Sequence, residues 1–171
     1  AGASPAAIQL VPTVTVALRV NVQADQCPNV TAFSLTENPE QPNQFSGASI
    51  DDIDLQEHVT TATDPQPAIR SDGVRVTRCN VQRDVCITTA GNSTELQNRA
   101  EAALTEAGWF VNATASTTAY MLGDVLMPHD VIDVQGLGTK HNGPYQVSTV
   151  THVINAAEHF MDLELRRNAT G

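Results

Sequence analysis

Lysine is almost missing from this sequence, and acidic residues outnumber basic ones. The 171 residues include one lysine, Lys140, and 19 aspartates and glutamates against 9 lysines and arginines, which gives a formal net charge of −10. A surface this acidic repels phosphate backbones, so we expect no specific binding to nucleic acid. The Lys-poor composition fits either a GC-rich genome or a salt-loving host, and it does not separate the two.

Long hydrophobic runs are absent too. No stretch reaches the roughly 18 apolar residues that a membrane-spanning helix needs, so we expect no membrane partner. The first residues, Ala1-Gly2-Ala3, lack a basic and then apolar leader, so we expect no signal peptide. Apolar residues still make up 41% of the chain, which is enough to bury a core. This length fits one sizeable domain, or one domain with an extended arm.

Cysteine is scarce, with Cys27, Cys79 and Cys86 as the three residues of this type. An odd number argues against a complete disulfide framework, and no Cys-x-x-Cys pair indicates a zinc site. Cys79 and Cys86 flank a predicted hairpin, where they form either a cross-strand disulfide or two small half-buried side chains. We favour the second interpretation, because the cytoplasm is reducing.

Alternating apolar and polar residues predict a protein that is mainly β. The first predicted strand covers residues 9–23, with Leu18 at the centre of its apolar face. Residues 25–67 are interrupted by five prolines and are predicted to be loop with one or two short strands. Further strands are predicted at 74–79, 85–88, 109–115, 131–135, 145–154 and 160–166.

One helix is predicted, over Ser93–Ala107 (helix 93–107). Asn92 is its expected N-cap, Glu95 completes a capping box, and Gly108 is expected to end the helix in a left-handed conformation. Because the apolar stripe is rich in small residues, we expect the helix to lie close against one side of a β-barrel. The stripe consists of Leu96, Ala100, Ala103, Leu104 and Ala107.

No arrangement of residues in the sequence demands an enzyme. The histidine cluster matches no helical zinc motif, and Gly136-Leu137-Gly138 lacks a third glycine and precedes a strand, not a helix. We therefore expect no catalytic, cofactor-binding or metal-binding residues and no cofactor. A small hydrolase that uses the histidine cluster is the enzymatic alternative. That cluster consists of His129, Asp130, Asp133, His141, His152 and His159.

Four Asn-x-Ser/Thr sequons occur, at Asn29, Asn92, Asn112 and Asn168. Together with the acidity they would suit a secreted or surface adhesion domain that carries glycans. A chain rich in Ser and Thr produces sequons by chance, however, so we interpret them as mostly accidental.

The C-terminal part contains an ordered series of short motifs. These are Met127-Pro128-His129-Asp130, Gly136-Leu137-Gly138, Gly143-Pro144-Tyr145-Gln146-Val147, Val150-Thr151-His152 and Leu163-Glu164-Leu165-Arg166-Arg167-Asn168-Ala169. In this order, residues 70–169 resemble the end of the phage late control protein D family, the baseplate hub proteins of contractile tails and injection systems. One departure is His129, where the family has glycine. Another is length, since family hubs are about twice as long and carry two tube-like barrels.

The resemblance implies a mainly β (α+β) fold. Residues 71–171 would form a tube-like β-barrel domain with one packed α-helix, preceded by a strand-and-loop segment, residues 1–70, that is an arm or part of a second barrel. The implied function is structural: a homo-oligomeric, trimeric hub that joins the hexameric tail tube protein to the trimeric spike protein around a central channel. The tape measure protein is a further implied partner, and the implied location is the virion tail baseplate or injection particle. A different ring protein with the tail-tube fold, a tube initiator or distal tail protein, is the alternative.

Overall fold

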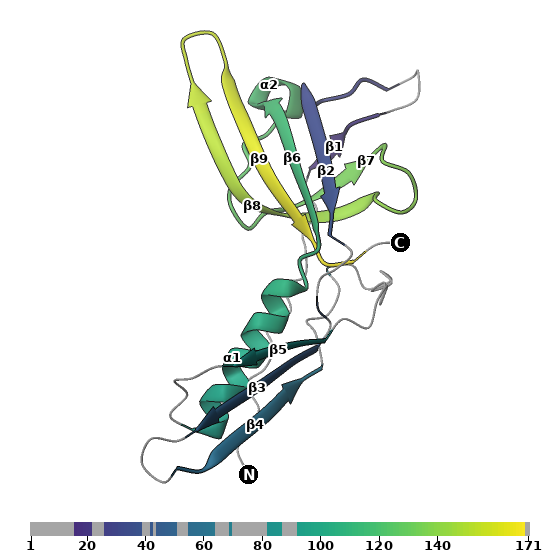
Figure 1. Cartoon of the computed structure of the whole chain (residues 1–171). Helices are drawn as coiled ribbons and strands as arrows, with labels where there is room; N and C mark the ends of the chain where they lie inside the picture. Colours follow the sequence, from purple (N-terminus) through teal and green to yellow (C-terminus); the bar gives the residue numbers. More distant parts are fainter. Residues whose placement is uncertain are drawn as a thin grey trace, which may run out of the picture.

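The computed structural model describes residues 16–21, 26–38, 42, 44–50, 55–63, 69, 82–86 and 92–169, with the backbone alone at 82–86. These residues form two units, a curled six-stranded sheet and a three-stranded sheet with a long helix (Figure 1). No helix in the described part is long and apolar enough to cross a membrane. The elements are β1 (Ala17–Arg19), β2 (Ala32–Glu37), β3 (Gln44–Ile50), β4 (Glu57–Ala62), β5 (Gln82–Cys86), α1 (Ser93–Ala107), β6 (Val111–Thr118), α2 (Ala119–Leu122), β7 (Val131–Gln135), β8 (Gly143–Ile154) and β9 (His159–Arg167).

The larger sheet has the strand order β1-β7-β8-β9-β6-β2 and curls into a half-barrel (Figure 1). All neighbours are antiparallel except β1 and β7, which are parallel. Side chains alternate between the two faces of each strand, so the buried apolar residues point inward. At the β8–β9 hairpin end, Val153, Ile154 and Phe160 are exposed. The outer face of β2, β6 and β9 is polar and exposed. The buried core consists of Leu18, Val111, Ala113, Ala115, Leu126, Ile132, Val134, Tyr145, Val147, Met161, Leu163 and Leu165.

Asn29 connects the two sides of the half-barrel. Its side chain accepts a hydrogen bond from the Arg19 N–H (2.6 Å) and donates one to the Ala17 carbonyl (2.9 Å), both on β1. Its backbone N–H donates to the Arg19 carbonyl, and its own carbonyl accepts from the Thr117 hydroxyl on β6. The residue is 5% exposed. It therefore links the edge strand β1 to β6, the neighbour of the opposite edge strand.

The end of β7 lies directly against the backbone that follows β1. Gly136 has a φ of +92°, and a Cβ atom at this position would lie 2.1 Å from the carbonyl oxygen of Asn21. The Val20 N–H donates to the Gln135 carbonyl at 3.0 Å beside this contact. Glycine is therefore required at 136 both by the left-handed conformation and by the close approach of two backbones.

The smaller sheet has the order β4-β3-β5, and α1 covers one of its faces. Leu96, Ala100 and Leu104 of the predicted stripe are buried. A Cβ atom added at Gly47 on β3 would lie 3.1 Å from the Leu96 Cδ1 atom, so the helix approaches the sheet closely there. The close packing expected from the small residues of the stripe is confirmed, although the partner is the small sheet and not the barrel.

The bounds of the helix and its N-cap are as predicted, but its C-cap is not. The Asn92 side chain accepts the Glu95 N–H at 2.9 Å. Gly108 has φ −64° and ψ −18°, which is right-handed, so the expected left-handed ending is wrong. The Gly108 N–H still donates to the Leu104 carbonyl, and the Trp109 N–H donates to that of Glu106, so the helical path continues past the end of α1.

The division of the chain differs from the boundary expected at residue 70. β1 and β2 precede that residue, yet they pair with β7 and β6 of the larger sheet. Helix α1, from the expected barrel domain, packs against β3 and β4. Alternation along a strand predicts which of its residues are buried but not which strand it pairs with, so the sequence did not assign strands to sheets.

Most predicted strands are present near their expected positions. β7 has the predicted bounds, and β6, β8 and β9 overlap their predictions. Residues 25–67 contain three strands, β2, β3 and β4, where one or two were expected. Of the predicted strand 9–23 the described part is β1 and its flanks, with Leu18 buried as expected. Residues 74–79 and the side chains of Cys79 and Cys86 lie outside the described residues, whereas Cys27 is an exposed free thiol.

The turn at residues 127–130 keeps a glycine-like conformation without a glycine. His129 has a φ of +76°. The Asp130 carboxylate accepts the Met127 N–H at 2.7 Å, and the Val147 N–H donates to the Asp130 carbonyl at 2.8 Å. These bonds hold His129 in the left-handed region, at the position where the late control protein D pattern has glycine.

Replacing His129 with glycine is therefore expected to stabilise the fold. A non-glycine residue in the left-handed region costs about 1–2 kcal/mol, and glycine loses about 0.5–1 kcal/mol of chain entropy on folding, so the net gain is about 0–1.5 kcal/mol. Urea unfolding would measure it as a higher midpoint. His129→Ala serves as the control, since alanine keeps the strain; an equal gain there would show that the turn is not the cause.

Candidate functional site

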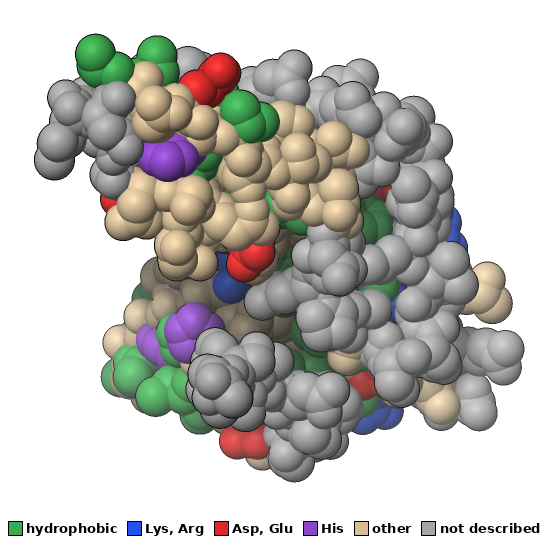
Figure 2. All heavy atoms as spheres, turned by 90° about the horizontal axis from the view of Figure 1, so that it is seen from below, with side chains coloured by type: hydrophobic (Ala, Val, Ile, Leu, Met, Phe, Trp, Pro, Cys, Tyr) green, Lys and Arg blue, Asp and Glu red, His purple; other side chains and the backbone are tan. Residues whose placement is uncertain are grey.

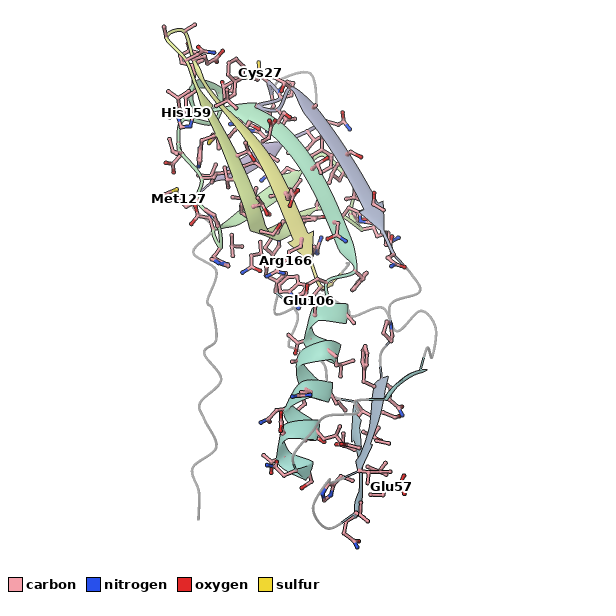
Figure 3. The ribbon with its side chains drawn as sticks, turned by 60° about the vertical axis from the view of Figure 1, so that its left-hand side comes forward. Cys27, Glu57, Glu106, Met127, His159 and Arg166 are labelled. Carbon is pink, nitrogen blue, oxygen red and sulfur yellow. The ribbon has the colours of Figure 1, made fainter. Side chains whose placement is uncertain are left out.

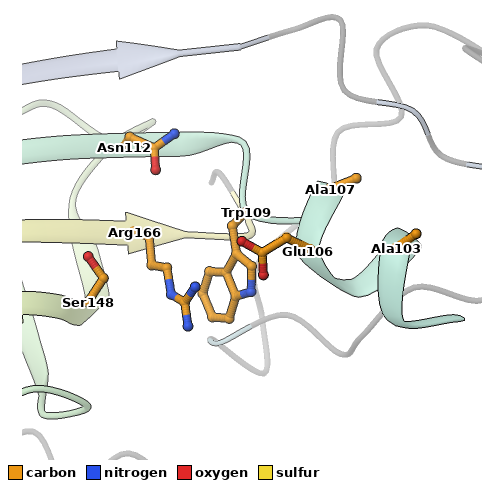
Figure 4. Close-up of a pocket in the computed structure, with 7 residues that line it drawn as sticks. All are labelled: Ala103, Glu106, Ala107, Trp109, Asn112, Ser148 and Arg166. Carbon is orange, nitrogen blue, oxygen red and sulfur yellow. The ribbon is translucent and has the colours of Figure 1, made fainter. Parts of the chain in front are cut away.

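A pocket of about 520 Å³ lies where the end of α1 meets the outer face of the six-stranded sheet. Figure 3 places Arg166, near the end of β9, close to Glu106, near the end of α1. In the view of Figure 2 the surface is hollowed, with a basic side chain in the hollow and an acidic one at its rim. The pocket is lined by Ala103, Glu106, Ala107, Trp109, Asn112, Ser148 and Arg166 (Figure 4).

Arg166 is held by a ring on one side and an amide on the other. Its guanidinium carbon lies 4.5 Å from the centre of the Trp109 ring. Its Nε donates to the Gln146 side-chain oxygen at 3.0 Å, and Gln146 stands directly opposite Arg166 in the β8–β9 ladder. Stacking on an aromatic face orients the plane of the guanidinium. Arg166 is thus a positioned cation, and no described residue forms a hydrogen bond with its two terminal nitrogens.

The helix side of the pocket has the opposite charge. Glu106 is an exposed carboxylate in the last turn of α1, which contains no basic residue. The carbonyl groups at the end of a helix add partial negative charge there. The pocket therefore has a positive side on the sheet and a negative side on the helix, with the Trp109 ring between Arg166 and Glu106 (Figure 4).

A second polar group lies on the inner face at the end of β9. Arg167 is completely buried, its Nη1 donates to the Asn142 carbonyl at 2.9 Å, and its guanidinium lies 5.3 Å from the Tyr145 ring. The Arg167 Nε and Nη2 atoms have no hydrogen-bond partner within the described part of the chain. Burial raises the pKa of Tyr145 above its ordinary value, and Arg167 opposes this rise. The Tyr145 hydroxyl donates to the His141 carbonyl.

This end of the half-barrel is also tied by charge. Lys140, in the β7–β8 turn, forms an ion pair of 2.6 Å with Glu37 at the end of β2. The His141 Nε2 atom lies 3.9 Å from the same carboxylate. The Arg167–Asn142 hydrogen bond joins the β7–β8 turn to β9, and the Lys140–Glu37 ion pair joins the same turn to β2. We interpret these two contacts as structural ones that close the half-barrel at this end.

The histidine cluster of the sequence is not assembled. Only His152 and His159 come together, with the Nδ1 and Nε2 atoms 3.0 Å apart across the β8–β9 ladder. The Asp133 carboxylate accepts from the Gln135 side chain, and His129 lies in its own turn. Among the described residues no group of three or more His, Cys, Asp or Glu could hold a metal ion. The Leu137 N–H in the Gly136-Leu137-Gly138 segment donates to the Asn142 side chain.

Two of the four sequons are structural. Asn29 and Asn168 are 5% and 2% exposed, and both side chains form hydrogen bonds with backbone groups. Asn92 is the N-cap of α1, and Asn112 is exposed at the pocket. A glycan on Asn29 or Asn168 would be incompatible with this packing, which weakens the adhesion-domain alternative.

Solved structures with a similar fold come from phage tails. The sequence itself matches no protein-family model and no curated protein sequence. A tail protein from Neisseria meningitidis MC58 is 11% identical, with a TM-score of 0.63 over 92% of this chain and 45% of that one. The 43 kDa tail protein of prophage MuSo2 from Shewanella oneidensis is 13% identical, with a TM-score of 0.62 over 94% of this chain and 46% of that one. The fold is that of phage tail proteins. This chain spans about half the length of each, and the mainly β prediction is confirmed.

Sequence reasoning found the tail-protein fold but missed the pocket. Trp109 was assigned to the predicted strand 109–115, and Arg166 to the predicted strand 160–166 and the C-terminal motif, but neither was assigned to a site. The available signal was the single tryptophan of the chain directly after the helix. A large aromatic ring at such a junction, half-buried here, commonly marks a contact surface.

Proposed function

We propose that this protein is a structural component of a phage tail or a related injection particle, and that it works as a baseplate hub subunit. The likeness in fold to two phage tail proteins over more than nine-tenths of this chain carries the proposal. The order of the C-terminal motifs supports the hub assignment, because it resembles the late control protein D pattern. The role is one of assembly, not turnover.

In this role the subunits form a ring that sits between a hexameric tube and a trimeric spike. The net charge of −10 supports a position in the wall of the central channel, because an acidic wall repels DNA and prevents it from adhering during passage. The partners of the ring are further copies of the chain, the tail tube protein and the spike protein, with the tape measure protein inside the tube.

Light scattering on a sizing column, at low and at molar salt, tests the proposal. A hub subunit is expected to form particles of three times 18.2 kDa, or to do so once the cognate spike protein is added. A ring of six copies would favour the tube-initiator or distal-tail alternative. A protein that stays monomeric alone and with both the spike and the tube protein would contradict the hub assignment.

A further inference from the structure

We propose that the pocket at Arg166 and Trp109 binds an acidic side chain of a second copy of this chain. This inference rests on the proposed function, because it assumes that copies of the chain assemble. It adds to that function a contact surface and the chemistry of the group that fills it.

The geometry of Arg166 suits a carboxylate. The stack on Trp109 and the bond from its Nε to Gln146 fix the guanidinium at two places. A guanidinium fixed by its face still presents its terminal N–H groups in its own plane, which is the fork that binds a carboxylate with two parallel hydrogen bonds. Figure 4 shows the guanidinium against the indole ring inside the pocket.

Three other cations of the described chain are already engaged or buried. Arg99 pairs with Glu95 on α1, and Lys140 pairs with Glu37. Arg167 is completely buried. Arg166 differs from these three because it lines a pocket, has no ion pair with any described residue, and is only half-buried.

A second copy is the partner because the proposed function assembles copies of this chain, and a cation on one copy can then meet a carboxylate on the next. Copies that each carry a charge of −10 repel one another unless a cation on one meets a carboxylate on the next. With 19 acidic residues, every copy presents carboxylates, and Arg166 offers each of them a preformed site. Asn112 lines the same side of the pocket and adds an amide that can donate to a carboxylate, whereas the Ser148 hydroxyl beside it already donates to the Glu164 carbonyl.

Glu106 gives the inference a second, opposite consequence. Its carboxylate lines the helix side of the pocket and repels an incoming carboxylate. Removing the charge at Arg166 and removing the charge at Glu106 must therefore change association in opposite directions. A general loss of fold or of surface charge would not weaken association in the Arg166 variant and strengthen it in the Glu106 variant.

The test is a dilution series of the whole chain, monitored by light scattering and by fluorescence of Trp109, the single tryptophan. Association is expected to shift the emission of Trp109, since its pocket fills. Arg166→Gln is expected to raise the dissociation constant about tenfold or more, and Glu106→Gln to lower it about two- to fivefold. Arg166→Lys should fall between, because it keeps the charge and loses the fork. Arg99→Gln, which removes an arginine on the exposed part of α1, is the matched control and should change nothing.

The outcomes separate the inference from the function. If the chain associates, but Arg166→Gln associates equally well and Trp109 emission is constant, the pocket is not at the contact and the inference is overturned while the hub proposal stands. If the unaltered chain never associates with itself, the inference is overturned, whereas the hub proposal is then decided by the experiment with the spike and tube proteins. If Arg166→Gln fails to fold, Arg166→Lys and Glu106→Gln still give the comparison of signs.

Discussion

Replacing Gly136 with alanine is expected to lower the free energy of unfolding by about 2–5 kcal/mol, from overpacking and left-handed strain together. The added Cβ atom would lie 2.1 Å from the carbonyl oxygen of Asn21 and 2.5 Å from its nitrogen. Both atoms belong to the backbone, so no side-chain rotation relieves the overlap. The end of β7 would have to move away from β1, at the cost of the Val20–Gln135 hydrogen bond. Chemical denaturation monitored by circular dichroism measures the loss.

Gly138 provides a matched control two residues away. Its φ of +81° is as unfavourable for alanine as that of Gly136, but a Cβ atom at 138 meets nothing within 4 Å. Gly138→Ala should therefore cost only the conformational strain, about 1–2 kcal/mol. The difference between the two losses in unfolding free energy measures the effect of the close contact between β7 and the backbone after β1. Equal losses in both variants would mean that this contact does not exist in the folded protein.

Replacing Asn29 with alanine is expected to cost about 2–4 kcal/mol of unfolding free energy, since it removes two hydrogen bonds and leaves partly buried backbone groups unpaired. The groups concerned are the Arg19 N–H and the Ala17 carbonyl, which the Asn29 side chain satisfies at 2.6 and 2.9 Å. Because Asn29 joins the two sides of the half-barrel, its loss should also speed hydrogen exchange in β1 and at the β6 end near Thr117. Urea unfolding and amide exchange together measure both effects.

Two further variants make the Asn29 experiment specific. Asn29→Asp keeps the acceptor for the Arg19 N–H and loses the donor to the Ala17 carbonyl, so its cost should be intermediate. Asn112→Ala removes an asparagine that is exposed on the outer face of β6, and it should change stability by less than about 0.5 kcal/mol. If Asn112→Ala lost as much unfolding free energy as Asn29→Ala, the role of Asn29 in linking β1 to β6 would be contradicted.

Local features of the sequence predicted local structure well. The bounds of α1, its Asn92 cap and its buried stripe follow from spacing of about 3.6 residues and from capping chemistry, which act within one turn. The strands β7, β8 and β9 likewise follow from alternation. Gly108 failed as a C-cap because glycine permits a left-handed ending without enforcing it. The assignment of β1 and β2 to the larger sheet depends on pairing across most of the chain, which no local pattern encodes.

The pocket was beyond sequence reasoning for the same reason. Arg166 meets Trp109 because β9 pairs with β6 in a register that places Asn112 opposite Arg166, at the end of the sheet that follows Trp109. Gln146 joins them through the separate register of β8 with β9. Three residues distant in the sequence are therefore brought together by two pairings. The sequence showed the residue types, whereas the registers created the site.

The shortness of β1 has a mechanical consequence. This strand has three residues and is attached to the half-barrel by its parallel ladder with β7 and by the side chain of Asn29. A tensile load applied to the chain ahead of residue 16 reaches these few bonds before it reaches the long ladders between β6, β8 and β9. β1 would detach first, while the rest of the sheet kept its shape. A particle that works under tension would thus yield at one defined strand and leave the β-sheet core behind it intact.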